Sequence, residues 1–263
     1  MKPLLAVVLV LVAGCAGPAT TPSFPVGAAA DYQLGGAYPP PSGVRLVVRD
    51  ATATPAPGVY NICYVNGFQT QPGERDLWLR ERRELILFDA NGNPVIDPNW
   101  PDELIVDTST ADKRARLAGI VGETVKTCAG KGFNAVEFDN LDSYSRSDGA
   151  LTAEDNLALA TTLAAAAHDA GLLAGQKNSA ELGRRGAGEA RFDFAVAEEC
   201  LRFGECAAYA QAYGDQVVDI EYTDDLPGPV DGVCALPDRP KSTTIRDRKL
   251  VTPSSPDHFH RHC

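Results

Sequence analysis

Residues 132–144 read GFNAVEFDNLDSY and place acidic side chains at the end of an apolar segment. The composition of this segment predicts a β-strand that ends at Asp139. Because strand side chains alternate between two faces, Glu137 and Asp139 point to the same side. Two neighbouring carboxylates raise each other's pKa unless a cation or donor intervenes, so they do not stabilise a fold. The pattern therefore indicates a functional site, although Asn140 and Asp142 are equally typical of a solvated turn.

The rest of the chain alternates between short apolar runs and helical patterns. Strands are predicted over residues 44–50, 60–65, 85–88, 104–107, 135–139, 172–175, 192–196 and 217–221. Helices are predicted after the N-cap candidates Ser109 or Thr110 and after Thr152, with which Asp155 completes a capping-box pattern. Gly130 and Gly171 are the expected stops of these two helices. Such alternation predicts an α/β fold with a mostly parallel sheet.

Carboxylates at the predicted strand ends favour a closed barrel over a doubly wound sheet. These residues are Asp50, Asp107, Asp139, Glu198 and Glu221. In a barrel, the C-terminal ends of the strands converge on one face, where active sites lie. A doubly wound sheet usually carries a Gly-rich phosphate loop, and the sequence contains neither G-x-G-x-x-G nor a Walker motif. We therefore expect a single-domain (β/α)8 TIM-like barrel, which suits a chain of 263 residues.

The N-terminus has the features of a bacterial export signal. Lys2 precedes an apolar run too short to span a bilayer, and the run ends in a lipobox-like Val-Ala-Gly-Cys at Cys15. We expect residues 1–15 to be a lipoprotein-type signal peptide, and an ordinary signal peptide cut nearby is the alternative. Residues 16–30, rich in Ala, Pro, Gly and Thr, are expected to be a flexible linker. Residues 31–263 would then form the catalytic barrel with a C-terminal extension.

Six cysteines follow Cys15, and an even number in an exported protein predicts disulfides. Fifteen pairings are possible. Cys200 and Cys206 are close enough to close a small loop. Cys234 and Cys263 would hold the C-terminal tail, which leaves Cys63 with Cys128. A zinc site is the alternative use, but the sequence has no C-x-x-C pair and its histidines are not grouped with these cysteines.

The formal net charge of −11 excludes the usual nucleic-acid-binding class, which needs Lys and Arg for the phosphates. An acidic cleft would instead attract a cationic partner. Clustered acids also suit Ca²⁺ or Mg²⁺, yet the D-x-[DN]-x-[DN]-G loop is missing. The histidines at positions 258, 260 and 262 are expected to belong to a solvated tail rather than a ligand set. We expect no metal and no cofactor.

Two further segments resemble parts of a carbohydrate site. Glu198 and Glu199 follow an apolar strand, and only one of them faces the barrel if the strand continues. Lys177 at another strand end would offset and orient the carboxylates, because neighbouring acids raise an ammonium pKa and disfavour a Schiff-base role. Two carboxylates across a cleft suffice for glycoside hydrolysis, one as acid and one as nucleophile or base.

At these segments the chain resembles glycoside hydrolase family 114, the endo-α-1,4-polygalactosaminidases, over about residues 31–225. The motifs that carry the resemblance are Tyr32-Gln33-Leu34, Cys63-Tyr64-Val65, Val136 to Asn140 with Asp142 and Tyr144, Ala167-His168, Lys177-Asn178, Ala197 to Cys200 with Glu205-Cys206, and Glu221-Tyr222. The resemblance implies a TIM barrel, hydrolysis of an α-1,4-linked galactosamine polymer, and Asp139 and Glu198 as the catalytic pair. Phe138 and Ala197 depart from the family's usual Pro and Asn, which puts the exact specificity in doubt.

We therefore predict a secreted or lipid-anchored, monomeric glycosidase, outside the cell or on the outer face of its membrane, that acts on a cationic amino-sugar polysaccharide. Asp139 is the expected nucleophile and Glu198 the expected acid/base. The expected substrate-binding residues are Gln33, Asp50, Tyr64, Asp107, Glu137, Asn140, Lys177, Glu221 and Tyr222. A non-catalytic carbohydrate-binding lipoprotein on the same scaffold is the main alternative, and a metal-dependent hydrolase is a weaker one.

Overall fold

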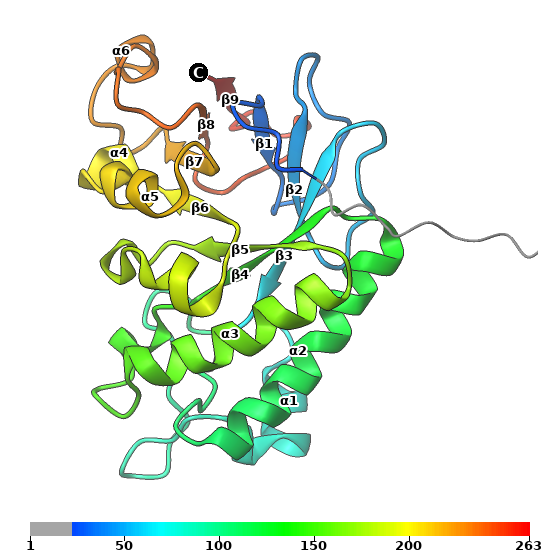
Figure 1. The fold of residues 1–263 in the computed structure, drawn as a ribbon, viewed down its shortest axis with the longest axis vertical. Coiled ribbons are helices and arrows are strands. Elements are labelled where there is room, and N and C mark those ends of the chain that lie inside the picture. The colour runs from blue at the N-terminus through cyan, green and yellow to red at the C-terminus, as the bar shows by residue number, and fades with distance from the viewer. Residues whose placement is uncertain (1–22) are drawn as a thin grey trace, which may run out of the picture.

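The computed structural model describes residues 23–263 and contains one nine-stranded sheet whose strand order follows the chain (Figure 1). The first eight strands are parallel to their neighbours, and the ninth pairs antiparallel with the eighth. The strands are β1 (Ala30–Tyr32), β2 (Leu46–Asp50), β3 (Tyr60–Asn66), β4 (Ala135–Asp139), β5 (Leu173–Lys177), β6 (Phe194–Glu198), β7 (Val217–Tyr222), β8 (Ser242–Arg246) and β9 (His260–His262).

Side chains bring the two ends of the sheet together. Arg246 on β8 donates to Asp31 Oδ1 at 2.8 Å and to the carbonyl of Tyr32, both on β1. On β9, His260 Nε2 lies 3.0 Å from the carbonyl oxygen of Ala30. The sheet is therefore a nearly closed barrel, which confirms the predicted fold and adds a ninth strand at the seam.

The helices lie outside the sheet, and the two longest, α2 and α3, lie against each other (Figure 1). Thr110 caps α2 through the amide of Lys113, and Thr152 forms the predicted capping box of α3 with Asp155. The residue that caps the C-terminus of α2 is Gly132, in the left-handed conformation, two residues after the predicted stop. The helices are α1 (Arg75–Glu81), α2 (Ala111–Lys131), α3 (Ala153–Asp169), α4 (Cys200–Phe203), α5 (Cys206–Tyr213) and α6 (Val230–Cys234), with short turns η1 (Arg83–Leu85), η2 (Ser143–Arg146), η3 (Ala180–Leu182) and η4 (Gly186–Ala190).

Alternation along the strands divides the core into two layers. Leu46, Ile62, Ala135, Val196 and Ile220 belong to one buried cluster inside the barrel. Their strand neighbours Cys63, Val136, Phe138, Ala195 and Ala197 pack with the helices in a second cluster. Most of these strands are largely apolar on both faces, as parallel strands generally are, so the charged side chains that reach solvent lie at their C-terminal ends.

Two of the predicted barrel strands are wrong. Residues 85–88 and 104–107 form only isolated antiparallel bridges, such as Ile86 with Val106, within the long segment between β3 and α2. Their places are taken by β1 and β8, which we did not predict as strands. The sequences of these two strands, ADY and STTIR, lack a long apolar run because they line the polar seam of the barrel.

The folded domain begins earlier than expected. Phe24 and Ala28 are buried, and Ala30 is the first residue of β1, so residues 23–30 are packed rather than a flexible linker. Phe24 lies against Phe194 with ring centroids 5.0 Å apart. The predicted signal peptide, Cys15 and the start of the linker lie outside the described residues. Within residues 23–263, no helix is both long and apolar enough to cross a bilayer.

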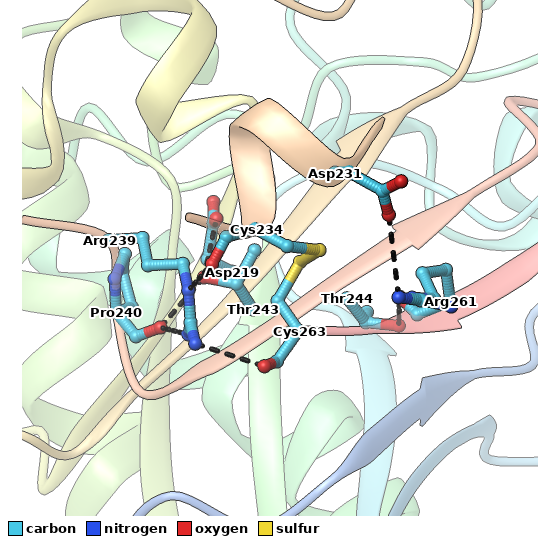
Figure 2. Close-up of a disulfide and its surroundings, with 9 residues drawn as sticks. All are labelled: Asp219, Asp231, Cys234, Arg239, Pro240, Thr243, Thr244, Arg261 and Cys263. Carbon is cyan, nitrogen blue, oxygen red and sulfur yellow. Dashed lines mark hydrogen bonds and ion pairs between the residues drawn. A yellow bond between two sulfur atoms is a disulfide. The ribbon is translucent and has the colours of Figure 1, made fainter. Parts of the chain in front are cut away.

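Three disulfides join the pairs expected from the sequence. Cys63–Cys128 links β3 to α2, and Cys200–Cys206 closes the turn between β6 and α5. Figure 2 shows the third bond, Cys234–Cys263, which ties α6 to the residue after β9, where Arg239 also donates to the carbonyl of Cys263 at 2.9 Å. The C-terminal histidines are therefore part of a tethered, half-buried strand and its approach, and the expected solvated tail is wrong.

Candidate active site

Three adjacent strands end with charged side chains that meet at the mouth of the barrel. β4 ends with Asp139, β5 with Lys177 and β6 with Glu198, and all three residues are in phase with the interior face. Lys177 Nζ lies 3.4 Å from Asp139 Oδ1 and 3.0 Å from Glu198 Oε2. The two predicted catalytic carboxylates therefore lie on either side of one ammonium group.

Hydrogen-bond donors fix the orientation of both carboxylates. Tyr64 on β3 donates to Asp139 Oδ2 at 2.7 Å, and Tyr222 on β7 donates to Glu198 Oε1. Asn178 donates to Glu198 Oε2 at 3.2 Å and accepts the Glu198 amide at 2.8 Å. Each carboxylate keeps some solvent exposure, 17% for the Asp139 side chain and 25% for that of Glu198. Both groups are thus held in place and accessible.

The chain turns sharply just after each of these strands. Asn140 (φ 63°), Asn178 (φ 49°) and Glu199 (φ 60°) adopt the left-handed conformation. Such residues cost free energy and are found where the surrounding structure needs a particular geometry. Asn tolerates this conformation better than most side chains, which explains the Asp-Asn and Lys-Asn pairs in the sequence. The turns allow each strand to end with its charged group directed at the mouth.

The charges at the mouth set one another's pKa. Burial lowers the pKa of Lys177, which is 2% exposed, but the charges of Asp139 and Glu198 raise it well above its ordinary value. Burial also raises the pKa of Glu198, but the charge of Lys177 and the hydrogen bond from Tyr222 lower it overall. Lys177 is therefore a fixed cation, and Glu198 is ionised in the unliganded protein.

Glu137 lies deeper in the barrel than predicted. It is completely buried and lies below the mouth rather than lining it. Its Oε1 accepts the hydroxyl of Tyr32 at 2.8 Å, whereas its Oε2 has no partner among the described residues. Burial raises the pKa of Glu137 to about 8. Glu137 thus carries a proton at neutral pH, directly beneath the charged groups.

Two other predicted substrate-binding residues point away from the mouth. Gln33 is buried on the outer side of β1, where it donates to Asp31 at 2.8 Å and accepts from Arg49 at 2.9 Å. Glu221 is in opposite phase to Tyr222 and accepts the amide of Leu201 behind the sheet. Adjacent strand residues face opposite sides, so Glu221 and Tyr222 cannot both line the groove. The same rule places Ala197 against the helices, so its difference from the family's Asn does not alter the mouth.

Asp50 and Asp107 use their oxygens locally. Asp50 accepts the amide of Thr52 at 2.8 Å, and the described residues show no contact between it and the carboxylate pair. Asp107 accepts the amide of Ser109 at 2.9 Å and forms an ion pair with Lys113. Because the segment before Asp107 is not a barrel strand, Asp107 stabilises the entrance to α2 rather than the mouth.

Glu198 and Glu199 have different surroundings. Glu198 belongs to the mouth, whereas Glu199 forms two hydrogen bonds, at 2.8 and 3.1 Å, with the guanidinium of Arg248. Asn140 also belongs to the mouth, because its amide donates to Asp139 at 2.9 Å. Two residues of the site were not predicted from the sequence. Tyr32 lies on a strand that we did not predict. Strand alternation would place Asn178 off the barrel face, but the left-handed turn reorients it toward Glu198.

Other clefts and clusters offer no comparable chemistry. A hollow of about 540 Å³ lies at the opposite end of the barrel, next to the starts of β5, β6 and β7, and Leu173, Asp193 and Gln216 line it. Within residues 23–263, one group of possible metal ligands has its atoms close together, namely Cys200, Cys206 and Asp219. The two sulfurs of that group are bonded to each other, so they are not free thiolates.

The mouth has the parts needed to cleave a glycosidic bond. A parallel barrel with two accessible carboxylates at the C-terminal ends of its strands defines the class of barrel glycoside hydrolases. The sequence matches the model of glycoside-hydrolase family GH114 over residues 13–263. The chain therefore belongs to family GH114 and is a glycosidase, which confirms the family resemblance.

Solved structures have the same fold. Ega3 of Aspergillus fumigatus, in complex with galactosamine, superposes with a TM-score of 0.72 at 21% identity, covering 93% of this chain and 98% of that chain. The glycoside hydrolase domain of PelA from Pseudomonas aeruginosa gives a TM-score of 0.57 at 15% identity, covering 86% of this chain and 96% of that chain. Among curated proteins there is no match.

Proposed function

We propose that this glycosidase cleaves α-1,4-linked galactosamine polysaccharide through Asp139 and Glu198. The observation that carries the proposal is the shared contact of both carboxylates with Lys177 Nζ, which places them on one open site. The chain shares its fold with Ega3, a protein solved with galactosamine bound. A galactosamine polymer is cationic, and the net charge of −11 would attract it.

The separation of the carboxylates supports retention of configuration. Asp139 Oδ1 and Glu198 Oε2 both contact Lys177 Nζ, at 3.4 and 3.0 Å. The two carboxylates therefore lie close together. Two carboxylates that share one ammonium group fit the roughly 5–5.5 Å spacing of retaining enzymes better than the roughly 6.5–9.5 Å spacing of inverting ones. In the proposed reaction Asp139 attacks the anomeric carbon, and Glu198 gives a proton to the leaving oxygen and then takes one from water.

Glu198 must carry a proton before it can act as the acid. In the free protein, Lys177 and Tyr222 keep its pKa below the ordinary value, so Glu198 is a proton donor only in the minority of molecules that carry the proton. That fraction rises as the pH falls. We therefore expect cleavage to be faster at acidic than at neutral pH.

Reducing-end release from a soluble α-1,4-galactosamine polymer tests the function. Asp139→Asn and Glu198→Gln should each lower the rate by at least about 1,000-fold while the protein stays folded. Asp215→Asn is a matched control, because Asp215 pairs with Lys241 at 2.6 Å away from the mouth and should keep the wild-type rate. Wild-type-like cleavage by either mouth variant would exclude the assigned pair.

A substrate with an activated leaving group separates the two roles. If Glu198 is the acid, Glu198→Gln should still form the glycosyl-enzyme from an aryl glycoside, because such a leaving group needs no proton. Asp139→Asn should form none, since the attacking oxygen is gone. The reverse result would exchange the roles. A carbohydrate-binding protein without catalysis would bind the polymer and release no new ends from any substrate.

Export and lipid attachment form a separate part of the proposal. The lipobox-like sequence ending at Cys15 and the three disulfides, which persist in oxidising compartments, both support it. Cys15→Ser in the full chain should abolish incorporation of labelled palmitate and move the protein from the membrane fraction to the soluble fraction. Equal labelling of both forms would contradict lipid attachment at this cysteine.

A further inference from the structure

The segment between β3 and α2 carries an exposed tryptophan on the catalytic side of the barrel. This segment lies with α1 at the lower end of the molecule in Figure 1. It folds back on itself through antiparallel bridges such as Ile96 with Leu104. Trp100 lies at the tip and is 63% exposed, the largest exposure of any large hydrophobic side chain among residues 23–263. Because the segment follows the C-terminal end of a barrel strand, it belongs to the face that holds the mouth.

A chain of hydrogen bonds connects the base of this tip to the catalytic strand. The amide of Glu103 donates to the Trp100 carbonyl at 2.8 Å. Glu103 Oε2 accepts from Asn66 Nδ2 at 2.9 Å, and Asn66 Oδ1 accepts from Asn140 Nδ2 at 2.9 Å. Asn140 follows Asp139 directly and donates its own amide to that carboxylate. Trp100 and Glu103 are thus held in a fixed relation to the reacting groups.

An ion-pair network fixes the same tip from the other side. The guanidinium of Arg146, in the segment after β4, lies 2.7 Å from Asp97 and 2.8 Å from Asp142. Asp97 in turn accepts from Gln69 Nε2 at 2.7 Å and orders the tip by accepting the amide of Asn99 at 2.8 Å. Gln69 is 3% exposed, and its Oε1 has no hydrogen-bond partner among the described residues. Such a buried polar group is costly unless something satisfies it, and a ligand is one means.

Glu103 has the features of a receptor for an ammonium group. It is 6% exposed, and the side chain that donates to it, Asn66, is a neutral amide. Only its Oε2 accepts a side-chain hydrogen bond from the described residues, which leaves Oε1 available. Burial raises the pKa of Glu103 to about 7, because the hydrogen bond from Asn66 and the charge of Arg146 offset only part of the burial effect. An ammonium group brought close would add a positive charge and lower the pKa.

We propose that Trp100 and Glu103 form a distal subsite for one amino-sugar residue of the polymer. The indole stacks against the apolar face of the sugar ring, and the carboxylate pairs with the ammonium group of that sugar. The inference rests on the proposed function and adds to it the element that recognises a part of the chain away from the bond that is cut. The rigid anchoring of the tip means that little ordering entropy is lost on binding, which favours affinity.

Michaelis constants for defined α-1,4-galactosamine oligomers test the subsite. Trp100→Ala should raise KM for a long oligomer about 3- to 10-fold, with kcat much less affected, because stacking on an aromatic ring is worth about that factor. The rise for a trimer should be clearly smaller, since a trimer at the cleavage point does not fill every subsite. Trp100→Phe should restore most of the loss, because a smaller aromatic ring still stacks. Equal rises for both lengths, or no rise for either, would overturn the proposal.

Glu103→Gln tests the charge. It should raise KM for the free amino polymer, and the rise should be absent with the same polymer after N-acetylation, because an amide carries no charge. An equal rise for both polymers would show that Glu103 acts only by holding the tip in place and would overturn the ammonium contact. Leu236→Ala is the matched control for loss of an exposed apolar side chain. Leu236 lies beside Gly27 and Lys241, which precede β1 and β8 at the opposite end of the barrel, and its loss should leave both constants at wild-type values.

Failure of this proposal is distinguishable from failure of the proposed function. If wild-type protein releases no reducing ends from any galactosamine chain, the assigned function fails. If the wild type cleaves but the Trp100 and Glu103 variants match it for every chain length, only the subsite fails. Fluorescence of the catalytically inactive Asp139→Asn protein gives an independent readout. Long oligomers should change its emission, and Trp100→Ala in the same background should remove that change; an unaltered change would refute a role for this indole.

Discussion

Replacing Lys177 by Met removes the cation between the two carboxylates and tests whether it governs their charge. Lys177 is 2% exposed and lies 3.0 Å from Glu198 and 3.4 Å from Asp139, so Met fills a similar volume without the charge. An ion pair with charges about 4 Å apart at an effective dielectric constant of 20 is worth about 4 kcal/mol. Loss of this energy should raise the pKa of Glu198, because burial then acts without the opposing charge of Lys177.

In Lys177→Met the pKa of Glu198 should therefore be higher than in the wild type, where the ammonium group holds it below its ordinary value. The assay is the rate of polymer cleavage between acidic and neutral pH. Because the two carboxylates then repel each other and lose the shared contact that orients them, the attacking and proton-donating groups are no longer held in position. We expect kcat to fall by at least about 100-fold there, since about 2.7 kcal/mol of the pair energy suffices for that factor. Any residual activity should have its optimum shifted to higher pH.

A folded protein is a condition of this test. Leaving buried carboxylates without their cation is expected to cost about 3–5 kcal/mol of unfolding free energy, so circular dichroism and thermal unfolding must accompany the kinetics. Lys113→Met is the matched control, because Lys113 also pairs with an aspartate, Asp107, but away from the mouth. A Lys177→Met protein with the wild-type rate and the wild-type pH profile would refute the reasoning, since the cation would then have no influence on the chemistry.

Three further predictions concern residues around the mouth and the seam. Glu199→Gln should keep at least about half of the wild-type rate, because the Glu199 carboxylate is engaged by Arg248 and not by the groups of the mouth. A loss as large as that of Glu198→Gln would contradict the choice of Glu198 as the catalytic residue. The pKa of Glu137 is about 8 in the folded protein, above its unfolded value, so folding keeps a proton that the unfolded chain has lost. Unfolding free energy should therefore fall as the pH rises from about 5 to 8, by up to about 1.4 kcal/mol per pH unit, and Glu137→Gln should reduce this slope in chemical denaturation. Replacing both Cys234 and Cys263 by Ser should lower the unfolding free energy by about 2–4 kcal/mol, measured in the same way, whereas an unchanged midpoint would show that β9 needs no covalent tether.

Alternation along strands accounts for the part of the site that the sequence predicts well. Asp139, Lys177 and Glu198 each end an apolar run, and the parallel order of β4, β5 and β6 brings such ends together. By the same alternation, the consecutive residues Glu221 and Tyr222 of β7 face opposite sides of the sheet, so only one of them can line the groove. The family resemblance selected Glu198 over Glu199, and the left-handed turn at Glu199 gives the physical reason why the two adjacent side chains diverge.

The errors arise where burial and polarity do not coincide. β8 is fully buried yet reads STTIR, because neighbouring elements satisfy its polar groups; for example, Thr243 donates to Asp219 on β7. Conversely, residues 104–106 are apolar and buried, but they pack within the segment that carries Trp100 rather than in the barrel. No local pattern separates these cases, since both depend on partners far away in the sequence.

The left-handed turns after β4, β5 and β6 have a consequence for anyone who modifies this enzyme. Each one opposes the preference of an L-amino acid, so a substitution there that relaxes the backbone would raise the melting temperature. The same relaxation would let the preceding charged group swing away from its partners, and turnover would suffer. Asn140, Asn178 and Glu199 are thus positions where heat tolerance and speed oppose each other, and thermostabilisation is better sought elsewhere on the scaffold.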